Sequence, residues 1–226
     1  MVEIRYLVTS ALPYVNNELH LGQFVGCILP ADVFTRFLRL KKEDTIYVCG
    51  TDEYGTPIAV AAQKEGLAPK QLADKYYALQ KKAIEGFNIS ADIFSRTTSP
   101  EHIKVVQDFY LKLKQNDYIY RKEIEQLYCE KCRRFLPDRY VEGKCPRCGK
   151  DARGDQCDVC GNPLEPTQLI EAHCATCGTA PVKKKSEHVF FDLPKAEEKL
   201  GEWLENGVDL FANAENFATS FLKGGL

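Results

Sequence analysis

The sequence has 226 residues, a hydrophobic share of 44% and a formal net charge of −2. This length suits one large domain or two modest ones, and the hydrophobic share is sufficient for a core without covalent cross-links. A charge so close to zero argues against a protein that binds nucleic acid through bulk electrostatics. No apolar run reaches the roughly twenty residues of a membrane span, so we expect a soluble protein of the cytoplasm.

The first part of the chain alternates strands with helices. Residues 4–9 predict a short buried strand, and a loop follows over residues 10–18. A helix is expected from about His20 toward Lys41, bent or interrupted at Pro30. Its apolar stripe is expected to comprise Phe24, Ile28, Ala31, Phe34 and Leu38.

The alternation continues to about residue 116. Residues 45–49 predict a second strand, with a loop over 50–55 and a helix opened by Thr56 as its cap and Pro57 at the first helical position. Further elements are a helix over 69–86, a strand over 93–96 and a helix that starts at Ser99-Pro100 and ends near Asn116. This order predicts a parallel α/β layer.

The character of the sequence changes after Asp117, where we place a domain boundary between residues 1–117 and 118–226. The second part begins with a predicted strand over 118–128 and continues with a cysteine-rich stretch over about 129–180. A strand over 187–193 and helices over 194–206 and 210–222 complete it.

Four Cys-x-x-Cys pairs dominate the second part, at 129/132, 145/148, 157/160 and 174/177. A structural Zn²⁺ ion takes four ligands in a tetrahedron, and eight thiolates complete two such sites. Three of the pairs are followed directly by glycine, which is typical of the tight turns of zinc knuckles. The pattern therefore predicts two structural zinc sites.

A disulfide scaffold is the alternative interpretation of these cysteines. The chain opens with Met1-Val2-Glu3 and passes straight into a strand-like stretch without a signal peptide, so we expect no oxidising compartment. The two remaining cysteines, Cys27 and Cys49, have apolar neighbours and are interpreted as packed thiols.

Basic residues crowd the knuckles and admit two interpretations. A four-thiolate zinc site carries a nominal charge of about −2, which nearby cations balance. The same cations also suit a contact with nucleic acid, and the sequence leaves both open. The residues are Lys131, Arg133, Arg134, Lys144, Arg147, Lys150 and Arg153.

The candidate chemistry lies in the first part, where the loop after the first strand ends in His20-Leu21-Gly22-Gln23. A helix N-terminus at the carboxyl end of a parallel strand favours phosphate, because its N–H groups are unpaired there. His20 and Gln23 are three residues apart and project from one face of the first turn, while Gly22 leaves room for a nucleotide.

Six segments, spread over essentially the whole chain and in the same order, resemble the N-terminal part of methionyl-tRNA synthetases. They are TSALPY at 9–14, HLGQ at 20–23, CGTDEYGT at 49–56, FLPDR at 135–139, GDQC at 154–157 and SEHVFFDLP at 186–194. The resemblance implies a Rossmann-like parallel-sheet nucleotide-binding half with an inserted small zinc-knuckle connective domain.

The resemblance also implies roles for single residues. His20 and Gln23 fall on the class I signature that steadies the phosphates of ATP, which makes them the candidate catalytic residues. Ala11 and Gly22 join them in the ATP site. Gln23 stands where many members have a second histidine, and an amide donates to a phosphate oxygen without becoming cationic.

Methionine recognition is implied for a second group of residues. Asp52 falls where the family holds the α-ammonium group of methionine, although an aspartate that only caps its loop is the alternative. Leu12 and Tyr14 border the amino acid, and Tyr14 offers an aromatic face to the thioether. Tyr54 replaces a histidine common in bacterial members, so its role stays open.

The implied activity is that of a methionine–tRNA ligase with Mg-ATP as substrate, acting as a monomer on methionine and the acceptor end of tRNA(Met), without a membrane. For zinc, the resemblance favours a nested arrangement over consecutive pairing of the motifs. Cys129, Cys132, Cys174 and Cys177 then form one site, and Cys145, Cys148, Cys157 and Cys160 form the other.

The family's second signature loop and anticodon-binding domain do not occur in these 226 residues, so we expect the isolated chain to be inactive. A non-catalytic synthetase-like module that binds tRNA or protein is the alternative function. A second alternative function is that of a zinc-ribbon interaction protein with an incidental α/β domain.

Overall fold

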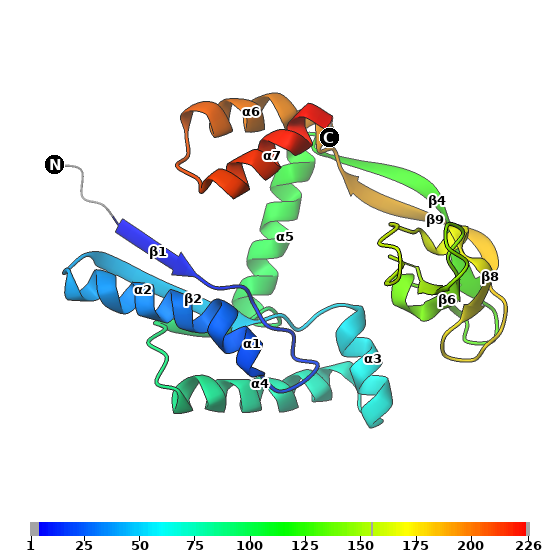
Figure 1. The fold of residues 1–226 in the computed structure, drawn as a ribbon, viewed down its shortest axis with the longest axis horizontal. Helices are drawn as coiled ribbons and strands as arrows, with labels where there is room; N and C mark the ends of the chain where they lie inside the picture. The colour runs from blue at the N-terminus through cyan, green and yellow to red at the C-terminus, as the bar shows by residue number, and fades with distance from the viewer. Residues whose placement is uncertain (1–4, 155, 225–226) are drawn as a thin grey trace. The chain divides into compact units, whose positions relative to one another are not determined.

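The computed structural model describes residues 5–154 and 156–224 (Figure 1). Ile4 of the first predicted strand and Asp155 of the GDQC segment lie outside the described residues. The chain divides into two compact units, one up to Asp108 and one from Phe109. The predicted domain boundary after residue 117 stays a prediction.

The first unit contains a three-stranded parallel sheet with the order β1-β2-β3. Its strands are β1 (Arg5–Thr9), β2 (Asp44–Thr51) and β3 (Ile93–Arg96). Leu7 pairs with Ile46, and Val48 pairs with Ile93. Helices connect the strands, as a parallel sheet requires, so the predicted α/β layer is confirmed.

A continuous helix follows the loop after β1, but its second turn is unusually wide. It consists of α1 (Leu21–Gln23), the π-helical turn η1 (Phe24–Ile28) and α2 (Leu29–Leu40). The N–H of Leu29 reaches back five residues to the carbonyl of Phe24. Pro30, which comes next, has no N–H to donate, and the predicted irregularity at this proline is therefore confirmed.

The buried face of this helix differs from the predicted stripe at one position. Phe24, Ile28 and Leu38 are buried as predicted, whereas Phe34 is 48% exposed and that prediction is wrong. The inward position belongs to Thr35, which satisfies its hydroxyl by donating to the carbonyl of Ala31 at 2.7 Å. A polar residue whose hydrogen bond is made within its own helix can occupy a core position that hydropathy assigns to its neighbour.

The helix Leu21–Leu40 also has the length and mean hydropathy of a membrane span, which the sequence reading did not anticipate. Length and composition are the only basis of that resemblance. Leu38 packs in the core with Val8 and Tyr47 of the sheet, and Figure 1 shows α2 running along β2.

Three more helices carry the chain from β2 to the end of the layer, namely α3 (Thr56–Glu65), α4 (Pro69–Gly86) and α5 (Pro100–Gln115). The predicted bounds of α4 and β3 match the structure. The predicted cap at Thr56 is wrong, because Gly55, at φ 97°, is the cap residue and Thr56 is already helical. Ser99 does cap α5, since its Oγ accepts from the N–H of His102 at 3.2 Å.

Among the described residues of the first unit, three clusters of buried side chains form the core. One joins the loop after β1 to α3 and α4, one joins the sheet to α2, and one joins η1 to α4. Their buried members are Val15, Ile58, Ala62, Leu72, Ala73 and Tyr76; Val8, Leu38, Tyr47 and Cys49; and Phe24, Ile28 and Ile84.

The second unit is built on a long antiparallel ribbon of β4 (Ile119–Cys129) and β9 (Val182–Phe191), which lie side by side in Figure 1. Stacked aromatic pairs support it, with the ring centroids of Tyr120 and Phe190 5.5 Å apart. β4 agrees with the predicted strand, whereas β9 begins five residues before the predicted start at residue 187. Its first residues include three consecutive lysines, and their low hydropathy hides the start of the strand from a prediction based on apolar patterns.

Short elements between β4 and β9 hold the knuckles, and the sequence reading did not predict them. They are β5 (Arg134–Phe135), η2 (Asp138–Tyr140), β6 (Val141–Lys144), β7 (Asp151–Arg153), η3 (Pro166–Gln168) and β8 (Ile170–Cys174). β6 lies between β7 and β8 in an antiparallel sheet. After β9, the 3₁₀ turn η4 (Pro194–Ala196) leads into α6 (Glu197–Asn206), and α7 (Ala212–Gly224) follows, close to the predicted helices.

Candidate functional site

The loop after β1 returns to the carboxyl end of β2 and pairs with it. Tyr14 and Asp52 form an isolated parallel bridge. The N–H of Asp52 donates to the carbonyl of Pro13 at 2.9 Å, and the N–H of Val15 donates to the carbonyl of Asp52 at 3.2 Å. The backbone thus brings together two residues predicted to recognise methionine, although they are 38 positions apart in the chain.

The side chains at this bridge are accessible to a ligand. Leu12 and Tyr14 are 43% and 44% exposed, and Asp52 is half-buried. Asp52 also accepts a hydrogen bond from the N–H of Tyr54 at its Oδ1, at 3.3 Å, so the loop-capping role is present. That bond involves one carboxylate oxygen, and the other can accept from an ammonium group.

His20 and Gln23 form a reciprocal capping box at the start of the helix. The Nδ1 atom of His20 accepts from the N–H of Gln23 at 3.3 Å, and the Oε1 atom of Gln23 accepts from the N–H of His20 at 3.1 Å. An accepting Nδ1 carries no proton, so a neutral ring is protonated at Nε2. Each side chain therefore keeps one donor, the Nε2–H of His20 and the amide group of Gln23.

Gly22 allows this box to form. A Cβ atom at Gly22 would lie 3.1 Å from Nδ1 and Cε1 of the His20 ring, a contact that the ring could relieve only by moving. The structure thus gives Gly22 a role toward His20, and the predicted role toward a nucleotide remains a prediction.

The two thiols outside the knuckles both contact the loop. The Sγ atom of Cys27 accepts from the N–H of Ala11 at 3.0 Å, and the Sγ atom of Cys49 accepts from the hydroxyl of Ser10 at 3.0 Å. Tyr47 donates to Ser10 at 3.2 Å, and burial raises the pKa of Tyr47 to about 12, which keeps its hydroxyl protonated as a donor. Cys27 and Cys49 are therefore packed thiols that also hold the loop.

A buried carboxylate that the sequence reading did not single out follows Asp52 directly. The Glu53 side chain has no exposed surface and accepts from Nε of Arg96 at 2.8 Å and from Thr51 at 3.1 Å. Arg96 also donates to Asp74 of α4 at 2.7 Å and lies over the ring of Tyr77. Only the acidic pair Asp52-Glu53 hinted at this site, and hydropathy places both residues in solvent.

The structure thus brings the predicted residues together in two pairs, Tyr14 with Asp52 and His20 with Gln23. Within the described ranges, no hydrogen bond or ion pair joins one pair to the other.

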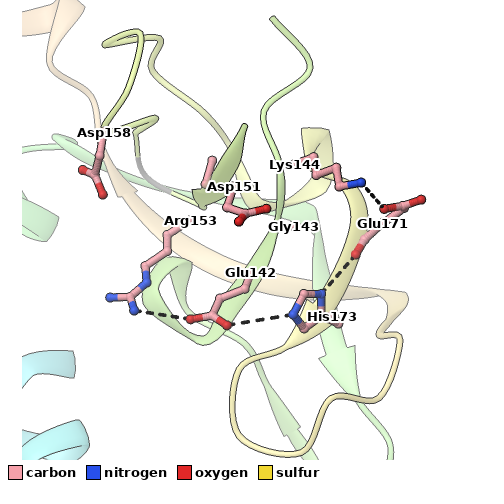
Figure 2. Close-up of a pocket in the computed structure, with 9 residues that line it drawn as sticks. Glu142, Gly143, Lys144, Asp151, Arg153, Asp158, Glu171 and His173 are labelled. Carbon is pink, nitrogen blue, oxygen red and sulfur yellow. Dashed lines mark hydrogen bonds and ion pairs between the residues drawn. The ribbon is translucent and has the colours of Figure 1, made fainter. Parts of the chain in front are cut away.

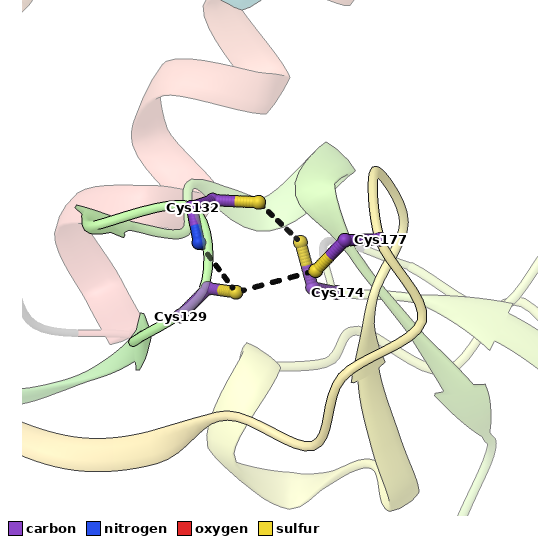
Figure 3. Close-up of side chains that lie close together, drawn as sticks. All are labelled: Cys129, Cys132, Cys174 and Cys177. Atoms are coloured by element: carbon purple, nitrogen blue, oxygen red, sulfur yellow. Dashed lines mark hydrogen bonds between the residues drawn. The ribbon is translucent and has the colours of Figure 1, made fainter.

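The outer knuckle pairs, 129/132 and 174/177, converge on one point, as Figure 3 shows. The Sγ atoms of Cys129 and Cys177 are 3.5 Å apart, and those of Cys132 and Cys174 are 3.9 Å apart. Four sulfurs bound to zinc at about 2.3 Å in a tetrahedron lie about 3.8 Å from one another. The four thiols therefore have the spacing of a zinc site.

The inner pairs, 145/148 and 157/160, form a second cluster of the same kind. The Sγ atoms of Cys145 and Cys160 are 3.8 Å apart, and those of Cys148 and Cys157 are 3.6 Å apart. In both clusters one cysteine of each pair is buried. The cysteines group in the nested arrangement, and the disulfide alternative is wrong because all ten are free thiols.

Hydrogen bonds at the outer cluster give its thiols different pKa values. Hydrogen bonds with Thr179 lower the pKa of Cys177 to about 6, whereas the hydrogen bond with Cys177 raises the pKa of Cys132 to about 12. Because zinc binds thiolates, loading this cluster releases protons.

Beside the clusters, a polar cavity of about 670 Å³ lies on the sheet of β6, β7 and β8 (Figure 2). Its lysine and its arginine each pair with a carboxylate: Arg153 with Glu142 at 3.3 Å and Lys144 with Glu171 at 3.2 Å. Two of the basic residues around the knuckles are thus neutralised by carboxylates. The cavity is lined by none of the predicted site residues.

The family model described as "tRNA synthetases class I (M)" matches residues 6–226. The chain belongs to this family, the class I methionyl-tRNA synthetases. The resemblance noted in the sequence is thereby confirmed over nearly the whole chain.

Two relatives illustrate the similarity. The chain is 48% identical over 228 residues to the cytoplasmic methionine–tRNA ligase of Homo sapiens, covering 99% of this chain and 25% of that protein. It is 48% identical over 220 residues to the methionine–tRNA ligase of Methanococcus vannielii, covering 97% of this chain and 33% of that protein. The chain therefore spans a quarter to a third of the length of these relatives.

A solved structure of Mycobacterium tuberculosis methionyl-tRNA synthetase in complex with methionyl-adenylate shares the fold. The TM-score is 0.69 at 24% identity, and the match covers 98% of this chain and 39% of that one. The Rossmann-like class with a zinc-knuckle insertion, predicted from the sequence, is confirmed by this likeness together with the two four-cysteine clusters.

Proposed function

We propose that this chain is the part of a cytoplasmic methionine–tRNA ligase that binds methionine and the phosphates of ATP. The observation that carries the proposal is the Tyr14–Asp52 bridge in a chain of the methionyl-tRNA synthetase family. In the proposed reaction, a carboxylate oxygen of methionine attacks the α-phosphate of Mg-ATP, and pyrophosphate leaves. The resulting adenylate then acylates the terminal ribose of tRNA(Met), and AMP leaves.

Asp52 is assigned to the α-ammonium group of methionine. A partly desolvated ammonium requires a carboxylate partner, and Asp52 presents one at the carboxyl end of β2, where α/β sheets bind ligands. Tyr14 and Leu12 are assigned to the methionine side chain, because a thioether is recognised by apolar and aromatic contact.

His20 and Gln23 are assigned to the phosphates, together with Ala11 and Gly22. The capping box leaves one donor on each of the two side chains, at the end of a helix that favours anions. Neither donor acts covalently, so the site works by position and by stabilising charge. Gln23 is an amide and adds no full positive charge to the site.

The two cysteine clusters are assigned to structural zinc. The sulfur spacing and the soft donor set fit Zn²⁺, and four protein ligands leave no position for a reacting water. When bound, zinc holds the knuckles folded, and we assign the knuckle module a contact with the acceptor end of tRNA.

Calorimetric titration with methionine tests the assignment of Asp52. The chain should bind methionine weakly, and Asp52→Asn, which keeps the size and removes the charge, should abolish the heat. Asp108→Asn, an exposed aspartate paired with Lys104, is the matched control. Equal binding by the Asp52→Asn variant would remove Asp52 from its role.

A synthetase-like module without catalysis is the second candidate, favoured by Gln23 and Tyr54 at positions where relatives of the family often have histidine. It predicts a folded, zinc-loaded chain that binds tRNA but neither methionine nor ATP. The same titration, repeated with ATP and with tRNA(Met), separates the two candidates.

A further inference from the structure

Gln80 of α4 connects this helix to the loop that carries Tyr14. Its side chain is 1% exposed, and its Nε2 group donates to the carbonyl of Tyr14 at 2.9 Å and to the carbonyl of Asn17 at 3.0 Å. An amide nitrogen has two hydrogens, and both are used on this loop. A single buried side chain therefore fixes residues 14–17 at two points.

The Oε1 atom of the same amide is buried and has no partner among the described residues. Burying an unpaired acceptor is unfavourable, and an apolar side chain of equal size would fill the space without that penalty. Packing alone does not account for a glutamine at this position. What the amide adds is its pair of donors to the loop.

The other side of the bridge is held by the same helix. Asp74, six residues before Gln80, accepts from Arg96, and Arg96 binds the buried Glu53 next to Asp52. Tyr77 lies between Asp74 and Gln80 in the sequence of α4, and its ring packs against the guanidinium group of Arg96. α4 thus braces the segment after β2 that carries Asp52 as well as the loop that carries Tyr14.

We propose that Gln80 is a positioning residue of the methionine site, which holds the Tyr14 loop against Asp52 in the geometry that binds the amino acid. The inference rests on the proposed function of that site. Gln80 acts through the backbone of Tyr14 and Asn17 and is assigned no contact with the substrate.

Gln80→Met tests this directly, because methionine has nearly the same size and no donor. The first measurement is amide hydrogen exchange at Val15 and Asp52, whose N–H groups make the bridge. Loss of the tether should raise both exchange rates by about tenfold or more, while amides of β1 and β2 remain protected. The second is the methionine dissociation constant, which should rise by about tenfold as well.

Two controls separate positioning from general loss of stability. Lys81→Met places the same new side chain at the exposed neighbouring position of α4. Leu38→Ala destabilises the sheet–α2 cluster, which includes neither Gln80 nor residues 14–17. Neither control variant should change both the amide exchange rates at Val15 and Asp52 and the methionine dissociation constant. Should Gln80→Met fail to fold, Gln80→Asn, which keeps the amide but shortens its reach by one methylene, replaces it.

Unchanged exchange at Val15 and Asp52 in the Gln80 variant would overturn the tether. Faster exchange with unchanged methionine affinity would overturn the positioning role. If the unmodified chain binds no methionine, the proposed function fails, while the exchange measurement still decides whether Gln80 holds the loop.

Discussion

Arg96 donates to Glu53 at 2.8 Å, and the carboxylate of Glu53 has no exposed surface. The Arg96 side chain is only 24% exposed, and its guanidinium also binds Asp74. Burial alone would lower the pKa of Arg96, but the hydrogen bonds to Glu53 and Asp74 outweigh it and raise this pKa. Arg96 is therefore charged in the folded protein, and it contacts the residue next to Asp52 of the candidate methionine site.

Removing Arg96 should destabilise the first unit strongly. Arg96→Ala leaves the Glu53 carboxylate buried without its cation, which costs about 3–5 kcal/mol in comparable pairs. Urea denaturation measures the loss of stability of the whole protein, and hydrogen exchange of the β2 amides measures the local loss. Arg121→Ala is the matched control, because its pair with Glu187 is exposed and should contribute no more than about 1 kcal/mol. Similar losses for the two variants would contradict the assignment.

Zinc stoichiometry can establish how the cysteines share metal. Unmodified protein should contain about two zinc ions per chain, one for each group of four thiols. The double variant Cys129→Ser/Cys174→Ser should lose one ion, because both residues belong to one cluster. Cys129→Ser/Cys145→Ser should lose both ions.

The reverse result for the two double variants would establish consecutive pairing of the motifs. Cys27→Ser, a thiol outside the clusters, should keep both ions and serves as the control. Elemental analysis of the purified variants provides the readout.

Acid should weaken the contact between α2 and the segment before β3. Burial raises the pKa of Asp32, but hydrogen bonds from Ser90 and Arg36 outweigh it, and the net pKa is lowered. A carboxyl whose folded-state pKa lies below its unfolded value stabilises the fold above the unfolded pKa, near 3.9. That stability is lost as the pH falls through the folded pKa, so the loss should occur below about pH 4.

The amide of Ser90 is the local probe of this titration, because its N–H donates to Asp32 at 2.6 Å. Its chemical shift should change, and its exchange protection should fall, over that acidic range. Asp32→Asn should abolish the acid transition and should cost about 2–3 kcal/mol at neutral pH. A transition that persists in the Asn variant would exclude Asp32 as its origin.

Gly50 should tolerate no side chain. A Cβ atom there would lie 2.7 Å from the carbonyl oxygen of Ser95 on β3, so Gly50→Ala must push β2 and β3 apart. We expect a loss of about 1–3 kcal/mol in thermal or urea denaturation. Gly86→Ala in α4 meets no atom within 4 Å and should be neutral or stabilising by up to about 1 kcal/mol. Equal stability of the two variants would rule out the close approach.

The parallel layer could be predicted because its elements have strong local signals. Apolar strands over 45–49 and 93–96 and the Pro69 start of α4 are properties of neighbouring residues, and the structure reproduces them. The knuckle strands could not be predicted in the same way. β6 and β7 are short and polar, and they form where the two four-cysteine clusters bring the chain together.

The candidate site likewise contains residues that the sequence could predict and residues that it could not. Cysteine spacing carried enough information to predict the two clusters, and family motifs pointed to Tyr14 and Asp52. Gln80 and Glu53 carried no such signal, because a single polar residue in a helix or loop is usually exposed. Their burial depends on contacts with residues 43 to 66 positions away in sequence, which local patterns do not encode.

The wide turn Phe24–Ile28 preserves the direction in which the start of its helix faces. A π-helical turn contains one residue more than an α-helical turn, and each residue of an α-helix turns the chain by about 100°. Deleting a single residue such as Gly26 would therefore restore a regular α-helical ladder and leave His20 and Gln23 facing nearly the same direction about the axis of α2. The wide turn lets the helix hold one extra residue without rotating the two side chains assigned to ATP by the roughly 100° that an added α-helical residue would cause.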